Sequence, residues 1–151
     1  MKLKSLKATY LLSKKFSKIL SNGDNVLLYG EIGVGKTTFV RSLINSFEKF
    51  KKVSQSEVLS PTFNIVYSYS IKDIKIMHYD FYRIRQSSEI EELNIFNDED
   101  TSITIVEWPK LLKIKPKNRI EIRFRYLKNF KGRKVYIKGF GSWKKYEFNK
   151  L

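Results

Sequence analysis

One stretch, VLLYGEIGVGKTTFVR at residues 26–41, constrains the fold of this chain more than any other. Gly30, Gly35, Lys36 and Thr37 satisfy the pattern G-x-x-x-x-G-K-S/T. An apolar run precedes the pattern, and apolar residues recur at helical spacing after it. The stretch therefore predicts a phosphate-binding loop between a buried strand and a helix, an arrangement found in α/β proteins.

The chemistry of phosphate binding explains this spacing. Glycines let the backbone turn its N–H groups inward, and the helix that follows adds its positive end. We expect Lys36 to reach the β- and γ-phosphates and the Thr37 hydroxyl to ligate Mg²⁺. Thr38 either donates to an α-phosphate or caps the helix. The nucleotide-binding residues predicted in this loop are Gly33, Val34, Gly35, Lys36, Thr37 and Thr38.

A phosphate-loop enzyme also needs a carboxylate at the end of a neighbouring strand, to hold Mg²⁺ or its waters or to polarise the attacking water. Asp80 closes the apolar run IKIMHYD, and Glu107 closes ITIVE. Ligands bind outside the carboxyl ends of parallel strands, so both acids are candidates, and the sequence leaves open which one touches the metal. Thr62, in the Pro-containing loop SPTF, is a candidate sensor of the γ-phosphate.

The rest of the chain predicts a sheet flanked by helices, with antiparallel strands late in the sequence. An apolar stripe over residues 3–20 predicts a helix with Ser5 as its N-cap. The other expected elements are a hairpin of strands at 64–71 and 74–79, a helix at 88–93, a strand at 103–106, a hairpin of strands at 119–126 and 135–140, and an edge strand at 143–148. We expect one α/β domain, with the P-loop NTPase fold, over residues 1–151.

Composition narrows the possible functions. The chain has no cysteine, which excludes a disulfide scaffold, a thiolate metal site and a cysteine nucleophile. It shows neither an apolar run of membrane-spanning length nor the pattern of a signal peptide, so we expect a cytoplasmic protein. The net charge is +15, and 15 of the 30 Lys and Arg but only 2 of the 15 Asp and Glu lie at 109–151. This excess of positive charge indicates either a surface that binds a nucleic acid or an acidic protein, or compositional drift in a Lys-rich chain.

Four motifs in this order, GEIGVGKTTF, SPTF, HYDFYRI and VEWP, resemble the bacterial TsaE (YjeE) family over about residues 3–140. The resemblance implies the ATP-binding component of the system that makes threonylcarbamoyladenosine (t6A) in tRNA. It implies ATP and Mg²⁺ as cofactors and a Mg²⁺-dependent ATPase that is weak alone and works with TsaB and TsaD. Hydrolysis would drive or reset that complex, with any contact to tRNA indirect.

The resemblance also assigns roles to particular residues. Lys36 and Thr37 match the phosphate-loop lysine and the magnesium threonine, and Thr62 matches a switch-like threonine. Asp80 matches a functionally required aspartate, and Glu107 matches the acid assigned to Mg²⁺ and hydrolysis. On this basis the catalytic residues are Lys36, Thr62, Asp80 and Glu107, and the metal ligands are Thr37 and Glu107.

In the family the adenine lies near the N-terminal segment and the late hairpin, which implies Ser5, Thr9 and Arg133 in this chain. Trp108 matches the tryptophan that adjoins the acid, and we expect it to pack or to contact a partner. The chain departs from the family at Leu93-Asn94, where the family tends to have Leu-Gly. Asn tolerates a left-handed backbone, so we expect the turn to survive.

Other functions remain alternatives. A small-molecule kinase would transfer the γ-phosphate to an acceptor, although the chain offers no separate lid-like arginine cluster. A basic RNA-binding module would bind RNA even after Lys36→Ala. A GTPase is disfavoured because no N-K-x-D tetrapeptide occurs. His78, the single histidine, is interpreted as structural rather than as a proton shuttle. Arg83 and Arg85 are secondary candidates for a cation at the transition state.

Overall fold

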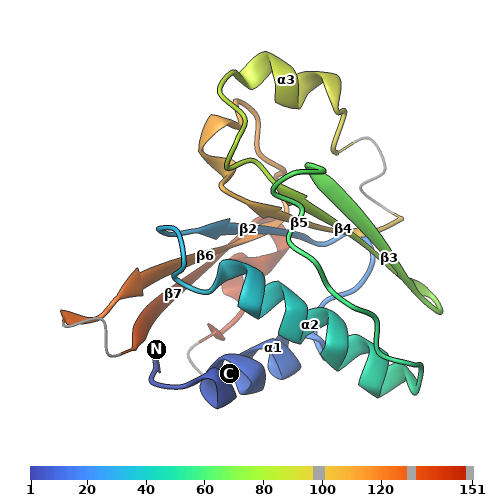
Figure 1. The fold of residues 1–151 in the computed structure, drawn as a ribbon, viewed down its shortest axis with the longest axis vertical. Helices are drawn as coiled ribbons and strands as arrows, with labels where there is room; N and C mark the ends of the chain where they lie inside the picture. Colours follow the sequence, from blue (N-terminus) through green and yellow to red (C-terminus); the bar gives the residue numbers. More distant parts are fainter. Residues whose placement is uncertain (97–100, 129–131, 149–151) are drawn as a thin grey trace.

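The computed structural model describes residues 1–96, 101–128 and 132–148. Its centre is a seven-stranded sheet in the order β1-β7-β6-β2-β5-β4-β3. Helices α1 and α2 lie on one side of the sheet, and α3 lies on the other (Figure 1). The strands are β1 (Lys2–Leu3), β2 (Asn25–Tyr29), β3 (Val66–Ile71), β4 (Ile74–Asp80), β5 (Ile103–Glu107), β6 (Arg119–Tyr126) and β7 (Arg133–Phe140). The helices are α1 (Leu6–Phe16), α2 (Lys36–Lys51) and α3 (Ser87–Glu92), with short 3-10 turns η1 (Pro109–Leu111) and η3 (Gly141–Lys145).

The four central strands, β6, β2, β5 and β4, run parallel, and the flanking strands are antiparallel. β7 pairs with β6, β1 pairs with β7, and β3 pairs with β4, each in the antiparallel sense. The expected mixed α/β sheet is therefore confirmed. The expected late antiparallel hairpin is formed by β6 and β7, and β6 also pairs in parallel with β2, which joins the hairpin to the central strands.

The central strand β2 is buried on both faces, which explains its unbroken apolar sequence. Val26 and Leu28 belong to the core beneath α1 and α2. Leu27 and Tyr29 belong to the core on the opposite face, which includes Ile90 of α3. Alternate residues of a strand point to opposite faces, so one short run supports both layers and holds the loop that follows it in place.

Helix α1 begins where the sequence predicts and ends earlier. The Ser5 hydroxyl accepts a hydrogen bond of 3.2 Å from the Ala8 N–H, as an N-cap does. The helix ends at Phe16, not near residue 20, and the Ser17 hydroxyl donates to the Lys14 carbonyl at 3.0 Å. This local bond gives the chain an alternative to another helical turn, so the apolar stripe continues into a turn.

The segment at 143–148 is not the expected edge strand. Gly141, with φ of 61°, turns the chain out of β7 into the 3-10 turn η3. Trp143 then donates its indole N–H to Asp24 Oδ1 at 2.8 Å, and Phe148 stacks on Phe16 with ring centroids 6.1 Å apart. Phe148 therefore packs into the core and Trp143 packs against it, whereas Tyr146 stays exposed.

The turn after α3 survives the replacement of glycine, because Asn94 adopts φ of 47° in the left-handed region. Residues 97–100, which follow this turn, lie outside the described residues. Within the described ranges, no helix is both long and apolar enough to cross a membrane.

Candidate phosphate-binding site

The loop between β2 and α2 makes tight backbone turns that require glycine. Gly30 has φ of 147°, and a Cβ atom there would lie 2.7 Å from the backbone oxygen of Phe124. Gly35 has φ of 105° and is the N-cap of α2. A side chain at Gly30 would collide with the neighbouring strand, so this glycine lets the loop pass close against the sheet.

Lys36, the first residue of α2, turns back over its own loop. Its Nζ atom donates to the carbonyl oxygens of Gly30 at 3.0 Å and Glu31 at 2.9 Å. The ammonium also lies 3.8 Å from the centroid of the Trp108 ring. Burial lowers the pKa of Lys36, and the nearby carboxylates of Glu107 and Asp80 oppose part of that effect. The lysine is therefore a partly desolvated cation at the mouth of the loop.

The two candidate acids lie side by side at the ends of adjacent parallel strands. Asp80 of β4 is directly opposite Glu107 of β5 in the register. Both residues are buried, with 3% and 1% of their surface exposed. The sequence could identify each strand end, and the parallel pairing of β4 with β5 brings the two ends together next to the loop.

Glu107 joins the phosphate loop to the sheet. Its Oε2 atom accepts a hydrogen bond of 3.0 Å from the Thr37 hydroxyl, and its Oε1 atom lies 3.0 Å from His78 Nε2. We place the proton on Nε2 because an ionised carboxylate can only accept. His78 is completely buried, and its Nδ1 atom has no hydrogen-bond partner among the described residues.

The contact of His78 with Glu107 was not foreseen from the sequence. A usable signal was present: His78 and Asp80 are two positions apart in one strand, so their side chains share a face. Glu107 and Ile105 are likewise two apart in β5, and Ile105 is the register partner of His78. The alternation within β4 could therefore have placed His78 on the same face as Asp80, and the register of β4 with β5 then brings Glu107 to that face.

Asp80 holds a second loop. Its Oδ2 atom accepts a hydrogen bond of 2.8 Å from the Thr62 hydroxyl, and its Oδ1 atom accepts one of 2.8 Å from the Tyr82 N–H. The Ser60 and Thr62 hydroxyls lie 2.8 Å apart. The SPTF loop, distant from Asp80 in the sequence, is thus attached to the strand end that faces the phosphate loop.

These groups surround one cavity of about 320 Å³. The predicted residues that line it are Gly33, Gly35, Lys36, Thr37, Thr38, Thr62, Asp80 and Glu107. Trp108 also lines it, together with three residues that were not predicted: Ile32, Ser60 and Tyr82. The cavity therefore combines a cation, hydroxyl groups and two carboxylates, which are the groups that polyphosphate and Mg²⁺ need.

Other predicted residues lie outside this cavity. Val34 is buried in the core beneath α1 and α2. Ser5 caps α1, and the Thr9 hydroxyl lies 3.5 Å from the Ser5 carbonyl oxygen. Arg133 packs against the loop, with its Nε atom 3.4 Å from the position of a Cβ on Gly35. The adenine contacts assigned to Ser5, Thr9 and Arg133 stay predictions, and Lys131 in the same turn lies outside the described residues.

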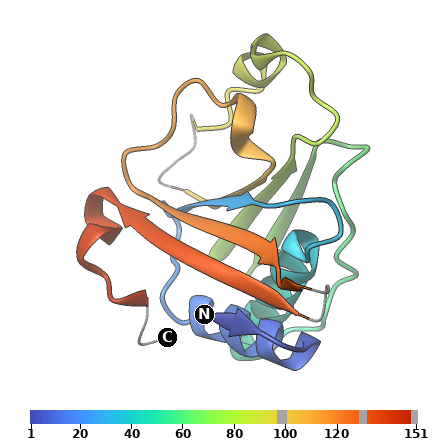
Figure 2. The ribbon, with the colours of Figure 1, turned by 90° about the vertical axis from the view of Figure 1, so that its left-hand side faces the viewer.

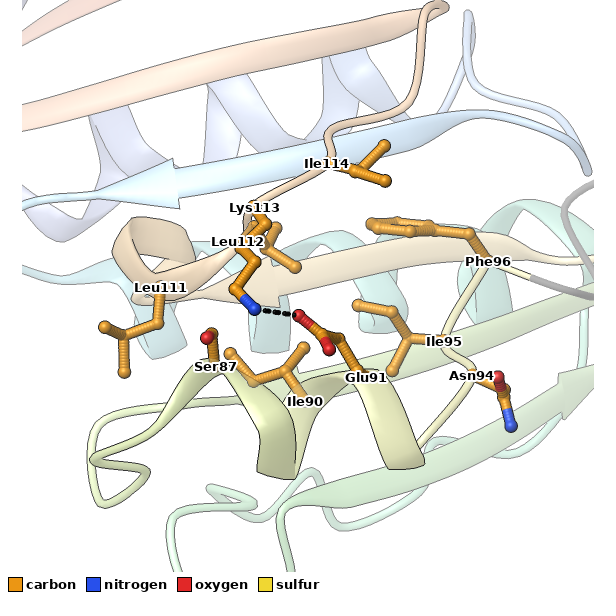
Figure 3. Close-up of a pocket in the computed structure, with 10 residues that line it drawn as sticks. All are labelled: Ser87, Ile90, Glu91, Asn94, Ile95, Phe96, Leu111, Leu112, Lys113 and Ile114. Atoms are coloured by element: carbon orange, nitrogen blue, oxygen red, sulfur yellow. Dashed lines mark ion pairs between the residues drawn. The ribbon is translucent and has the colours of Figure 1, made fainter.

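A second hollow, of about 470 Å³, lies between α3 and the segment that follows η1 (Figure 3). Its wall is mostly apolar, with an ion pair of 2.8 Å between Lys113 and Glu91. None of the predicted site residues lines it. The chemistry expected of a phosphate site therefore belongs to the cavity at the ends of β2, β4 and β5.

Parallel central strands, helices on both faces and a glycine-rich loop between β2 and α2 define an α/β protein with the P-loop NTPase fold. Residues 3–135 match the family model described as "Threonylcarbamoyl adenosine biosynthesis protein TsaE". The chain belongs to the TsaE family.

Relatives agree with this assignment, and a solved structure agrees with the fold. A Rickettsia typhi protein named "tRNA threonylcarbamoyladenosine biosynthesis protein TsaE" is 35% identical over 130 residues, which cover 85% of this chain and 88% of that protein. A protein of the same name from Borreliella burgdorferi is 37% identical over 121 residues, covering 78% and 83%. The crystal structure of Bacillus subtilis YdiB matches the fold with a TM-score of 0.73 at 20% identity, covering 95% of this chain and 86% of that one.

Proposed function

We propose that this protein is the ATP-binding and ATP-hydrolysing subunit of the cytoplasmic machinery that makes t6A in tRNA, acting with TsaB and TsaD. Membership of the TsaE family and the names of the relatives support the pathway. The cavity beside the phosphate loop supports the ATPase activity. Family membership favours hydrolysis of ATP over transfer of its γ-phosphate to a small-molecule acceptor.

The observation that carries the proposal is the hydrogen bond of 3.0 Å between Thr37 and Glu107 at the start of α2. Mg²⁺ prefers oxygen ligands and takes one or two from the protein, with the rest from phosphate and water. A hydroxyl and a carboxylate at this separation, next to a glycine-rich loop, fit that preference. The bound metal would neutralise charge on the phosphate oxygens.

The remaining residues fit the same chemistry. On binding a nucleotide, Lys36 would exchange the carbonyls of Gly30 and Glu31 for phosphate oxygens, which bind an ammonium more strongly than neutral carbonyls do. Thr62, attached to Asp80, lines the same cavity and would sense the terminal phosphate. Asp80 and Glu107 are the two carboxylates that line the cavity, and either would polarise an attacking water. His78 holds Glu107 in place from beneath the site.

Mg²⁺-dependent ATP hydrolysis by the purified chain, alone and with TsaB and TsaD, tests the proposal. We expect hydrolysis to rise sharply with the partners and to be lost in Glu107→Gln. Glu48→Gln is the matched control, because Glu48 is also buried but contacts Ser56, away from the cavity. A rate of hydrolysis that does not change when the partners are added, or that is retained in Glu107→Gln, would contradict the proposal. Transfer of phosphate to a small acceptor would support the kinase instead.

A further inference from the structure

None of the helices in the described part of the chain covers one face of the β6–β7 hairpin. Ile120, Ile122 and Phe124 of β6 and Val135 of β7 point into the core on the side of α1 and α2. The alternate residues of both strands therefore point to the opposite side. That side is covered by α3 and its loops over β2 and β4, and it is open over β6 and β7 (Figure 2).

We call this open surface the basic sheet face. It consists of Arg119, Arg123 and Arg125 from β6 and Lys134, Tyr136, Lys138 and Phe140 from β7. The single acid in the same rows, Glu121, is buried and bound by Arg119 at 3.0 Å and Arg123 at 3.1 Å. Among the described residues, Arg125, Lys134 and Lys138 form no ion pair. The face therefore carries a strong uncompensated positive charge.

Aromatic rings alternate with these cations. Tyr136 is 44% exposed, and its ring centroid lies 4.8 Å from Lys134 Nζ and 5.8 Å from Arg125 Cζ. The ring centroid of Phe140 lies 3.8 Å from Arg119 Cζ and 5.1 Å from Lys138 Nζ. Cations lie over both rings, so a planar group that stacks on a guanidinium plane, or that takes the place of a cation on a ring, would have its own negative charges neutralised at the same time.

We propose that the basic sheet face binds a single strand of RNA. Proteins that bind single strands combine cations that follow the backbone with rings on which the bases stack, and a guanidinium plane also serves as a stacking surface. An acidic protein would match the charge, whereas a single strand of RNA would match the charge and would also supply planar bases at the spacing of the rings and guanidinium groups. The choice of RNA as the nucleic acid rests on the proposed function, in which the modified molecule is a tRNA.

A hollow of about 510 Å³ extends from this face toward the phosphate cavity. Arg123 and Arg125 line one part of it, and Tyr82 and Trp108, which also line the phosphate cavity, line another. A strand bound on the basic sheet face would therefore reach the rim of the nucleotide site. This proximity offers a route by which RNA and nucleotide could influence each other's binding.

Fluorescence anisotropy with a labelled single-stranded RNA of about 12 nucleotides tests the proposal. The double variant Arg125→Gln/Lys138→Gln should bind more weakly and with a less steep salt dependence. The slope of log K against log salt should decrease by about 1.4, since each phosphate contact to a single strand contributes about 0.7. Lys14→Gln/Lys18→Gln removes the same charge from one exposed position in α1 and one in the turn after it, and should leave both quantities unchanged.

A third variant, Tyr136→Leu, separates stacking from charge. Loss of one stacked base weakens binding by about 5- to 150-fold. The salt slope should remain that of the unchanged protein, because no cation is lost. Thermal unfolding followed by circular dichroism checks that the strand survives the substitution.

Three outcomes would overturn the proposal. One is the absence of RNA binding at low salt, and another is an equal loss of affinity in the two charge-removing doubles, which would indicate diffuse attraction. The third is an affinity for polyglutamate that equals the affinity for RNA and does not change in Tyr136→Leu. That result would identify an acidic protein as the partner. ATP hydrolysis measured on the same variants keeps the two proposals separate: failure of RNA binding with intact hydrolysis refutes only the RNA site.

Discussion

The hydrogen bond between His78 and Glu107 predicts a measurable loss of stability when the imidazole is removed. In His78→Leu, the Oε1 atom of the buried Glu107 carboxylate loses its partner at 3.0 Å, whereas Oε2 keeps Thr37. A hydrogen bond to a charged group contributes about 1.5–3 kcal/mol. His78 Nδ1 is buried with no hydrogen-bond partner among the described residues, which costs stability in the unchanged protein. Removing this atom therefore offsets part of the loss. We expect a net decrease of about 2 kcal/mol in the free energy of unfolding.

Urea unfolding of the nucleotide-free protein measures this decrease, and two further variants test its cause. His78→Gln keeps an N–H donor near the position of Nε2 and should lose less than His78→Leu. In a double-mutant cycle, His78→Leu should cost less in a Glu107→Gln background, because no buried charge is then left unpaired. An equal cost in both backgrounds would refute the reasoning and would assign the effect of His78 to packing alone.

Three other predictions concern the loop and a turn. Burial lowers the pKa of Lys36, whereas bound phosphate favours its ammonium form, so ATP affinity should fall as the pH rises above that lowered pKa. Calorimetry in buffers of different ionisation enthalpy should detect the proton that the protein takes up when ATP binds. Gly30→Ala, which forces a Cβ against the Phe124 backbone, should reduce the free energy of unfolding by about 2–4 kcal/mol in urea. Asn94→Ala should lower the thermal midpoint, at a cost of about 1 kcal/mol, whereas Asn94→Gly should not.

Much of the site follows from local patterns in the chain. The glycine spacing around Lys36 and Thr37 specifies a backbone shape that few other sequences adopt, so the loop and its flanking strand and helix were predictable. Asp80 and Glu107 were also found locally, as acids that end apolar runs. Such features can be predicted from neighbouring residues alone, because backbone preferences and the hydrophobic period are determined by a few adjacent positions.

The partnerships between distant segments depended on the three-dimensional structure. A period of two places a residue on a face of its strand without specifying which strand lies beside it or in which direction it runs, so the parallel pairing of β6 with β2 was not predictable. The contact of His78 with Glu107 depends on the β4–β5 register. The inward packing of Trp143 depends on Asp24, a residue far away in the chain. Long-range packing sets these contacts, and it likewise gathers the scattered cations of β6 and β7 onto one open face.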